Sequence, residues 1–294
     1  MSRWVGEKAS EIMLQRGEAA EVWLSKVDQT IERFARERGY ELIRTLEGGT
    51  VNAVVLGRDS EGNYIVVKAA MSERSIKDET RLLRELGPGM APRVLDYEGF
   101  CMAMELVGGD HDYGPQAGAE AVATLMKKLE SVEFGSYMPA DIAGQYTRAI
   151  ERLAWGDKSR VVEYEKVWEV IADTIEEALS ERAMVVHGDL WRSNILVGEN
   201  GSKFIDPCPR VAAKGYDIGY WVSDPNDEGP VGERLSLVSH LSGVSFVEGL
   251  AFAAHFAGHH LGWWERFRGG EDLSRARMRF DETVELTHEV FRAR

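Results

Sequence analysis

The sequence has few of the features that mark secreted, membrane-spanning or zinc-binding proteins. Its 294 residues include only two cysteines, Cys101 and Cys208, which excludes a disulfide framework. It contains no C-x-x-C or H-E-x-x-H metal signature, and no apolar run approaches the ~18 residues of a transmembrane helix. The first residues, Met1 to Lys8, lack the apolar core of a signal peptide. We therefore expect a cytoplasmic protein.

Positive charge is also scarce. The chain has 35 Lys and Arg residues against 49 Asp and Glu residues, which gives a formal net charge of −14. This balance argues against nucleic-acid binding and is compatible with a cationic ligand, although acidic surfaces also keep proteins soluble. The 44% hydrophobic and 29% charged content is typical of a globular protein that can form one domain or two lobes.

The sequence does contain a polar loop between two apolar segments. Residues 184–186 and 195–197 predict strands, and the loop between them reads His187-Gly188-Asp189-Leu190-Trp191-Arg192-Ser193-Asn194. Its Asp and Asn are five residues apart, as in the H-R-D-x-x-x-x-N loop of kinases. An Asn-Gly turn follows at residues 199–202, and the return strand of this hairpin carries Asp206 back beside the loop.

These residues predict a phosphoryl-transfer centre. In kinases the Asp receives the proton of the acceptor hydroxyl, and the Asn and a second carboxylate hold Mg²⁺. Asp189 is therefore the candidate catalytic base, and Asn194 and Asp206 are the candidate metal ligands. His187 is expected to shape the loop. Asp and Asn also bind nearby backbone in ordinary loops, but the complete pattern favours the chemical interpretation.

An antiparallel sheet is expected upstream of the polar loop. Residues 41–46, 51–56 and 64–68 have the pattern of a three-strand meander, with a glycine-rich first turn. Glycines let the backbone approach a phosphate closely, although hairpin turns also use glycine for other reasons. The candidate nucleotide-binding residues in this turn are Gly48, Gly49 and Thr50.

Lys68 ends the third of these strands, and Glu79 lies in a predicted helix over residues 75–86. Glu79 is three residues from both Ile76 and Leu82, so it shares their buried face. A carboxylate on a buried face is costly unless it is paired. We therefore expect an ion pair between Lys68 and Glu79. The alternative is a Glu at the edge of the helix that reaches solvent.

Most of the remaining chain is helical in pattern. A packing helix is expected over residues 18–38, ended by Gly39. In a later helix His255 and His259 are one turn apart, as metal ligands can be, but no third ligand is suggested, and packing is favoured. The helices expected after the sheet cover residues 117–133, 141–155, 161–182, 246–267 and 272–292.

Acidic residues follow the catalytic hairpin in a proline-containing loop. Asp224, Asp227 and Glu228 lie there, and Glu265 lies in a later helix. A cleft lined by charges of one sign concentrates ligands of the opposite sign. We therefore predict a cationic acceptor that contacts these carboxylates. The alternative is a solvated acidic face remote from the site.

From Tyr40 onward the chain resembles the aminoglycoside phosphotransferase family. The resemblance is carried by the glycine-rich turn, Lys68, Glu79, the catalytic hairpin and Asp217. Ile205-Asp206-Pro207, in place of the D-F-G of protein kinases, is similar to the branch that contains streptomycin 6-phosphotransferase and hydroxyurea phosphotransferase. Trp191-Arg192-Ser193 differs from the His-Pro-Gly or similar sequence expected there.

The resemblance implies an α+β, protein-kinase-like bilobal fold. Residues 1–107 would form a small N-terminal lobe with an antiparallel sheet. Residues 108–294 would form a larger, mainly helical C-terminal lobe with the catalytic loop and the acceptor site, and ATP would bind between the lobes.

The resemblance also assigns further residues to the nucleotide and to the catalytic loop. Lys68, supported by Glu79, would contact the nucleotide phosphates. Glu105 and Val107 would lie in the hinge that binds the adenine edge. Asp217 would brace the catalytic loop through hydrogen bonds. A plain helix-capping role for Asp217 is the alternative.

We therefore predict a small-molecule kinase that uses ATP and Mg²⁺ and phosphorylates a hydroxyl of an aminoglycoside, aminocyclitol or amino sugar. Sugar, fructosamine-like and hydroxyurea-like acceptors are alternatives. The enzyme would act as a monomer or homodimer and would bind neither nucleic acid nor a membrane. A protein kinase is disfavoured, because H-G-D lacks the Arg that reads a phosphorylated activation loop. Only ten residues separate Asp206 from Asp217, too few for an activation segment. A silent nucleotide-binding module is the last rival, and the complete polar set disfavours it.

Overall fold

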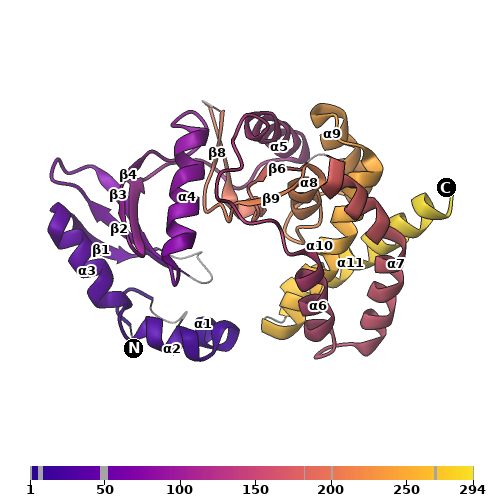
Figure 1. Cartoon of the computed structure of the whole chain (residues 1–294), viewed down its shortest axis with the longest axis horizontal. Helices are drawn as coiled ribbons and strands as arrows, with labels where there is room; N and C mark the ends of the chain where they lie inside the picture. Colours follow the sequence, from indigo (N-terminus) through magenta and orange to yellow (C-terminus); the bar gives the residue numbers. More distant parts are fainter. Residues whose placement is uncertain are drawn as a thin grey trace. The chain divides into compact units, whose positions relative to one another are not determined.

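The computed structural model describes residues 2–5, 9–46, 52–181, 183–199, 201–267 and 270–293 (Figure 1). The chain divides into two compact units, Met1–Gly108 and Gly109–Arg294. The turn with Gly48, Gly49 and Thr50 lies outside the described residues. Within the described segments, no helix combines the length and the apolar character needed to cross a membrane.

A five-stranded antiparallel sheet forms the centre of the first unit. Its strand order is β1-β2-β3-β5-β4, which confirms the predicted meander and places β5 beside β3. The strands are β1 Glu41–Thr45, β2 Ala53–Arg58, β3 Tyr64–Ala69, β4 Val94–Glu98 and β5 Cys101–Glu105.

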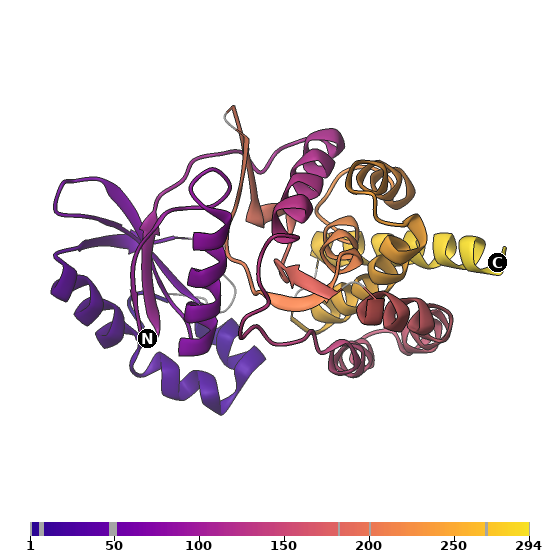
Figure 2. The same cartoon turned by 45° about the horizontal axis from the view of Figure 1, so that its top comes forward.

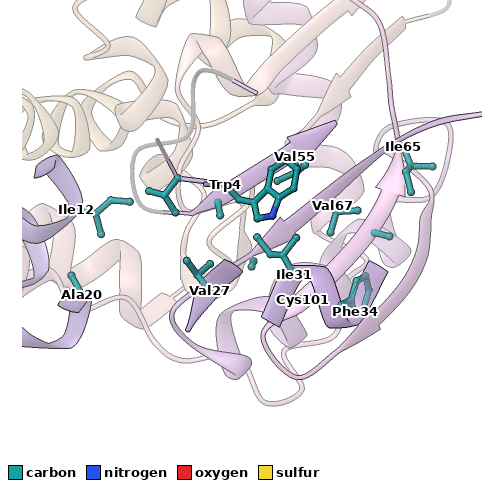
Figure 3. Packing of buried hydrophobic residues seen from close by; sticks show 14 residues of the cluster. Trp4, Ile12, Ala20, Val27, Ile31, Phe34, Val55, Ile65, Val67 and Cys101 are labelled. Atoms are coloured by element: carbon teal, nitrogen blue, oxygen red, sulfur yellow. The ribbon is translucent and has the colours of Figure 1, made fainter. Parts of the chain in front are cut away.

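The two faces of β3 have different neighbours. Ile65, Val67 and Ala69 alternate onto the face that packs with the N-terminal helices in a buried apolar cluster (Figure 3). Lys68 projects from the opposite face toward helix α4, Glu73–Leu86, which begins after the capping residue Ser72. In both overall views α3, Val27–Arg38, and α4 lie on opposite sides of the sheet (Figures 1 and 2).

The first forty residues form three helices, whereas the sequence predicted one over residues 18–38. Gly17, with a φ of 57°, separates the first two, and the chain leaves the helical conformation again at Lys26. Gly39 ends the third helix in the left-handed conformation, as predicted. Their role is to cover the sheet. The helices are α1 Ala9–Arg16, α2 Glu18–Leu24 and α3 Val27–Arg38.

The second unit is mostly helical and contains two short two-stranded sheets. The five predicted helices are present, and the hairpin at the Asn-Gly turn is confirmed as β7 paired with β8. The sequence did not predict β9, which pairs with β6, or α9. The strands are β6 Ala183–Val186, β7 Ile195–Gly198, β8 Gly201–Phe204 and β9 Arg210–Ala213. The helices are α5 Pro115–Leu129, α6 Ile142–Leu153, α7 Lys158–Glu181, α8 Gly215–Val222, α9 Val231–Ser242, α10 Phe246–Phe267 and α11 Gly270–Arg292.

Helix α8 packs against α10 at backbone distance, and α10 also contacts α6, α7 and α11 (Figure 1). A Cβ atom on Gly219 would lie 2.4 Å from the carbonyl carbon of Phe252, and one on Gly215 would lie 2.7 Å from the ring of the same residue. The two glycines are four residues apart and therefore share one face of α8. Because neither has a side chain, α8 can approach α10 closely, and its other residues are held in fixed positions.

Candidate functional site

Asp217 holds the first residues of the polar loop through their backbone. Its carboxylate accepts hydrogen bonds from His187 N at 2.6 Å and Gly188 N at 2.9 Å. Asp217 is completely buried in the first turn of α8. Burial raises its pKa to about 7, and the two backbone N–H groups act in the opposite direction. Both carboxylate oxygens of Asp217 thus contact the catalytic loop.

Gly188 is required where the loop passes the chain beyond the hairpin. Its φ is +81°, and a Cβ atom there would lie 2.0 Å from Cys208 O. The two segments are also hydrogen-bonded here, because Cys208 N donates to His187 O at 2.8 Å. Since any side chain at residue 188 would collide with backbone, only glycine fits.

Hydrogen bonds join the catalytic loop to the end of the hairpin. Asn194 Nδ2 donates to Asp189 O at 2.7 Å, and Ile205 N donates to Asn194 O at 3.0 Å. The Nε2 atom of His187 lies 3.1 Å from Ile205 O, which fits an Nε2–H donor. The next residue, Asp206, has a φ of 55°, the one positive value for a non-glycine residue in the described chain. These contacts bring the loop and Asp206 together, as the sequence predicted.

The donor set of Asn194 and Asp206 fits Mg²⁺. Their amide and carboxylate oxygens are the hard ligands that Mg²⁺ prefers, and Mg²⁺ commonly uses only one or two carboxylates beside substrate phosphates. The Asn194 amide nitrogen is already bound to Asp189 O, which turns the amide oxygen away from that contact. Among the described residues no group of three or more His, Cys, Asp and Glu side chains could hold a metal by itself.

Tyr220 contacts Asp189 and was missed by the sequence-based prediction. Its hydroxyl donates to Asp189 Oδ1 at 2.7 Å. Tyr220 lies three residues after Asp217 on α8, so both side chains reach the catalytic loop from the same face of one helix. That spacing is the signal that could have identified it.

Trp191 and Arg192, which differ from the sequence expected from the family resemblance, are both packed against other parts of the protein. The Trp191 ring packs on the His260 ring with centroids 4.2 Å apart. Arg192 is buried, and its guanidinium donates to Tyr113 O at 2.8 Å and to Asp227 Oδ1 at 2.6 Å. Aromatic packing therefore holds Trp191, and hydrogen bonds of its buried guanidinium hold Arg192.

Two carboxylates of the acidic loop after α8 are buried and bound by other parts of the protein. Asp224 Oδ2 accepts from Arg192 N at 2.7 Å, and burial raises the pKa of Asp224. Asp227 lies between two cations, with Arg192 on Oδ1 and Arg234 Nη1 2.7 Å from Oδ2. Arg279 Nη2 donates to Asp227 O at 2.8 Å. Because the carboxylates of Asp224 and Asp227 are buried and engaged, the structure contradicts their use as acceptor contacts.

The other two predicted acceptor contacts, Glu228 and Glu265, differ in their exposure and in their arginine partners. Glu228 is exposed, and its backbone N donates to Asp227 Oδ1 at 3.0 Å. Glu265 Oε1 accepts from Arg277 at 2.8 and 3.0 Å, and its side chain is almost fully covered. Of the four carboxylates, Glu228 alone is exposed and without an arginine partner among the ion pairs of the described chain.

The first unit contains the predicted ion pair. Lys68 Nζ lies 2.7 and 2.6 Å from the two carboxylate oxygens of Glu79, which confirms the pairing. The residues are 2% and 3% exposed, so the pair is shielded from water and salt. Lys68 is fixed in register opposite Val54 and Met102 in the neighbouring strands.

The predicted hinge follows the end of β5. Glu105 is the last residue of this strand; its N donates to Arg93 O at 3.0 Å, and its Oε1 accepts from Arg93 N at 3.0 Å. Val107 is half-buried and lies beyond the strand, where the backbone has left the sheet. Contacts of these two residues with a nucleotide stay a prediction.

The histidines of α10 are packing residues in the described structure, as expected. His255 Nε2 lies 3.1 Å from Gln145 Oε1, and the Tyr164 hydroxyl lies 3.2 Å from His255 Nδ1. Burial lowers the pKa of both His255 and His259 to about 3. Both side chains are therefore neutral near pH 7.

Comparison with solved structures shows the fold. A microcompartment-associated aminopropanol kinase aligns with a TM-score of 0.67 at 16% identity, over 90% of this chain and 98% of that one. Aminoglycoside phosphotransferase APH(4)-Ia, in a ternary complex with AMP-PNP and hygromycin B, aligns with a TM-score of 0.66 at 13% identity, over 87% and 98%. A Plasmodium vivax ethanolamine kinase aligns with a TM-score of 0.57 at 14% identity, over 98% and 95%. The α+β, protein-kinase-like fold is thereby confirmed.

Sequence comparison shows the family. None of the curated proteins matches the chain. The model of the phosphotransferase enzyme family matches residues 42–207, which contain the ion pair, the catalytic loop and the hairpin. This match covers more than half of the 294 residues, so the chain belongs to the phosphotransferase enzyme family.

Proposed function

We propose that this enzyme transfers the γ-phosphoryl group of ATP to a hydroxyl of a small polar molecule, with Asp189 as the proton acceptor. The observation that carries the proposal is the hydrogen-bonded assembly of Asp189, Asn194 and the backbone before Asp206. In the reaction the acceptor oxygen bonds to the γ-phosphorus, the bond from that phosphorus to ADP breaks, and the hydroxyl proton passes to Asp189.

The residues assigned to the nucleotide have different tasks. Lys68, oriented by Glu79, would bind phosphate oxygens, and the backbone of Glu105 and Val107 would bind the adenine. Mg²⁺ bound by Asn194 and Asp206 would neutralise charge on the phosphates. We accordingly assign residues 1–107 to a nucleotide-binding lobe and residues 108–294 to a lobe with the catalytic loop and the acceptor site.

A small acceptor is favoured over a protein by the segment between Asp206 and Asp217. This segment forms β9, which pairs with β6, and α8 begins at Gly215. In protein kinases the corresponding part of the chain carries the activation loop with its phosphorylation site. The residues here are used by the sheet, and a loop that docks a peptide would have no chain to form it.

We propose an acceptor with an amino group, although most of the four predicted carboxylate contacts do not support it. Asp227 and Glu265, two of the four carboxylates on which the prediction rested, are paired with arginines, Asp224 is buried, and Glu228 is the exposed one. Support now comes from the names of structural neighbours, which are kinases of ethanolamine, aminopropanol and an aminoglycoside. Ile205-Asp206-Pro207 keeps streptomycin-like aminocyclitols and hydroxyurea as candidates.

A panel of acceptors tests the proposal. The enzyme with ATP and Mg²⁺ is incubated with aminocyclitols, amino sugars, amino alcohols, hydroxyurea and neutral sugars, and phosphorylated products are measured by mass spectrometry. We expect an amine-bearing alcohol to be preferred. Its KM should rise with salt more than the KM for ATP, because salt screens the attraction between charges, over ~8 Å at physiological ionic strength. Preference for a neutral sugar, with salt-independent kinetics, would contradict the acceptor class. Phosphorylation of a peptide alone would contradict the proposed function.

A further inference from the structure

Tyr220 and Asp189 form a contact that the proposed reaction has not yet used. The Tyr220 hydroxyl donates to Asp189 Oδ1 at 2.7 Å, while Asp189 Oδ2 lies 3.4 Å from Asn194 Nδ2. A carboxylate group can rotate about its Cβ–Cγ bond unless its oxygens are held. The strong hydrogen bond to Oδ1 therefore fixes the carboxylate plane and keeps Oδ2 on the side of Asn194.

The Tyr220 side chain is itself fixed by aromatic packing. Its ring lies 4.6 Å from Phe256 and 4.8 Å from His260 in α10, and 5.3 Å from Trp191 in the catalytic loop, measured between centroids. Gly219, directly before it, holds α8 against the backbone of α10. A side chain packed on three sides loses few conformations when it forms a hydrogen bond, so its hydroxyl is preorganised.

The Tyr220 hydroxyl keeps its proton in this environment and can donate it in a hydrogen bond. Burial raises its pKa well above the usual value, and the charge of Asp189 and the neighbouring Tyr216 and Cys208 act in the same direction. His260 beside it is kept neutral, because burial and His259 lower its pKa. The phenol thus keeps its proton and presents it to Asp189.

We propose that Tyr220 is a positioning residue for the catalytic base, which fixes Asp189 so that Oδ2 receives the proton of the acceptor hydroxyl. This inference rests on the proposed function of Asp189. Removing the hydrogen-bond partner that orients a metal ligand typically costs about 10–100-fold in activity, and we expect a loss of the same order for the partner that orients the base. The loss appears in kcat, because the contact concerns the geometry of proton transfer and involves no contact with ATP.

Tyr216 provides a matched control. It is also buried on α8, one turn before Tyr220, and its hydroxyl accepts from Gln145 Nε2 at 2.8 Å. Tyr216→Phe and Tyr220→Phe each remove one buried phenol hydroxyl and keep the ring. They differ in that only Tyr220 is bonded to Asp189.

The test is a double-mutant cycle with Asp189→Asn. We expect Tyr220→Phe to lower kcat about 10–100-fold, with the KM for ATP unchanged, and Tyr216→Phe to stay near wild type. In the Asp189→Asn background Tyr220→Phe should have little further effect on kcat. Slow ATP hydrolysis, with water as acceptor, gives the same comparison if no small molecule is phosphorylated. Equal kcat values for the two phenylalanine variants, or fully multiplicative effects in the cycle, would overturn the inference.

A second measurement uses the free enzyme without nucleotide or metal. Melting temperatures of the same cycle should be non-additive, because Tyr220→Phe and Asp189→Asn weaken one shared hydrogen bond. Additive shifts in Tm would contradict the contact itself. If Asp189→Asn alone kept full activity, the proposed function would fail, and this outcome is distinct from a failure of Tyr220→Phe to change kcat.

Discussion

Asp227→Ala should destabilise the protein strongly while leaving acceptor binding by the folded fraction unchanged. The substitution removes the carboxylate between Arg192 and Arg234. Breaking a buried ion pair on one side typically costs about 3–5 kcal/mol, since the remaining charge is buried without compensation. Arg234 keeps hydrogen bonds to two backbone carbonyls, of Trp221 and Val222, which places the expected loss near ~3 kcal/mol.

Urea unfolding followed by tryptophan fluorescence measures this loss. The matched control is Glu228→Ala, the next residue, whose exposed side chain should change the free energy of unfolding by less than about 0.5 kcal/mol. A domain typically has ~5–15 kcal/mol of stability, so Asp227→Ala should still fold and allow kinetics. If Asp227→Ala kept wild-type stability but raised the KM of the acceptor, Asp227 would be an acceptor contact and the structural explanation would be wrong.

Three further substitutions test other parts of the structure. Glu79→Gln should lower the free energy of unfolding by about 3 kcal/mol, because it leaves Lys68 buried without a counter-charge. It should also raise the KM for ATP, and unchanged values of both quantities would contradict the role of the pair. His255 has a folded pKa of about 3, below the ~6.5 of the unfolded chain, so its contribution is complete above pH ~6.5 and is lost as pH falls toward 3. His255→Gln should therefore make urea stability less pH-dependent by about 1.4 kcal/mol per pH unit near pH 5, and identical slopes would contradict its neutral burial. Gly219→Ala should cost about 1–3 kcal/mol and lower kcat, since its Cβ would meet the α10 backbone at 2.4 Å; a fully active, stable variant would show that α8 can shift freely.

Features with a local sequence signal were predictable. The catalytic hairpin follows from two apolar strands around an Asn-Gly turn, and the structure pairs these strands as β7 and β8. The partner of Lys68 followed from the helical periodicity that puts Glu79 on a buried face. In both cases one rule of secondary structure determines where the side chain points.

Features that depend on distant partners were not predictable. The acidity of Asp224 and Asp227 suggested a cation site, but Asp224 is buried on the backbone N of Arg192, and the charge of Asp227 is paired with Arg192 and Arg234. A sequence without the fold does not show which carboxylate meets which arginine. The helical break near Lys26 likewise has no glycine or proline that would mark it in the sequence.

Tyr220 is an intermediate case. Its spacing from Asp217 places both on one face of α8, so its approach to the loop follows from the helix alone. That it donates to Asp189 depends on the close contact of α8 with α10, which Gly219 permits.

The most direct test of the central claim is the rate of phosphoryl transfer by Asp189→Asn to the preferred acceptor, measured beside the affinity for ATP. Asparagine keeps the size of the side chain and cannot accept the hydroxyl proton as a carboxylate does. We predict a kcat lowered by roughly 10²–10⁴-fold, the range expected for a positioned proton acceptor, with ATP affinity little changed. A kcat near that of the wild type would contradict the assignment of Asp189 as the base and the mechanism built on it.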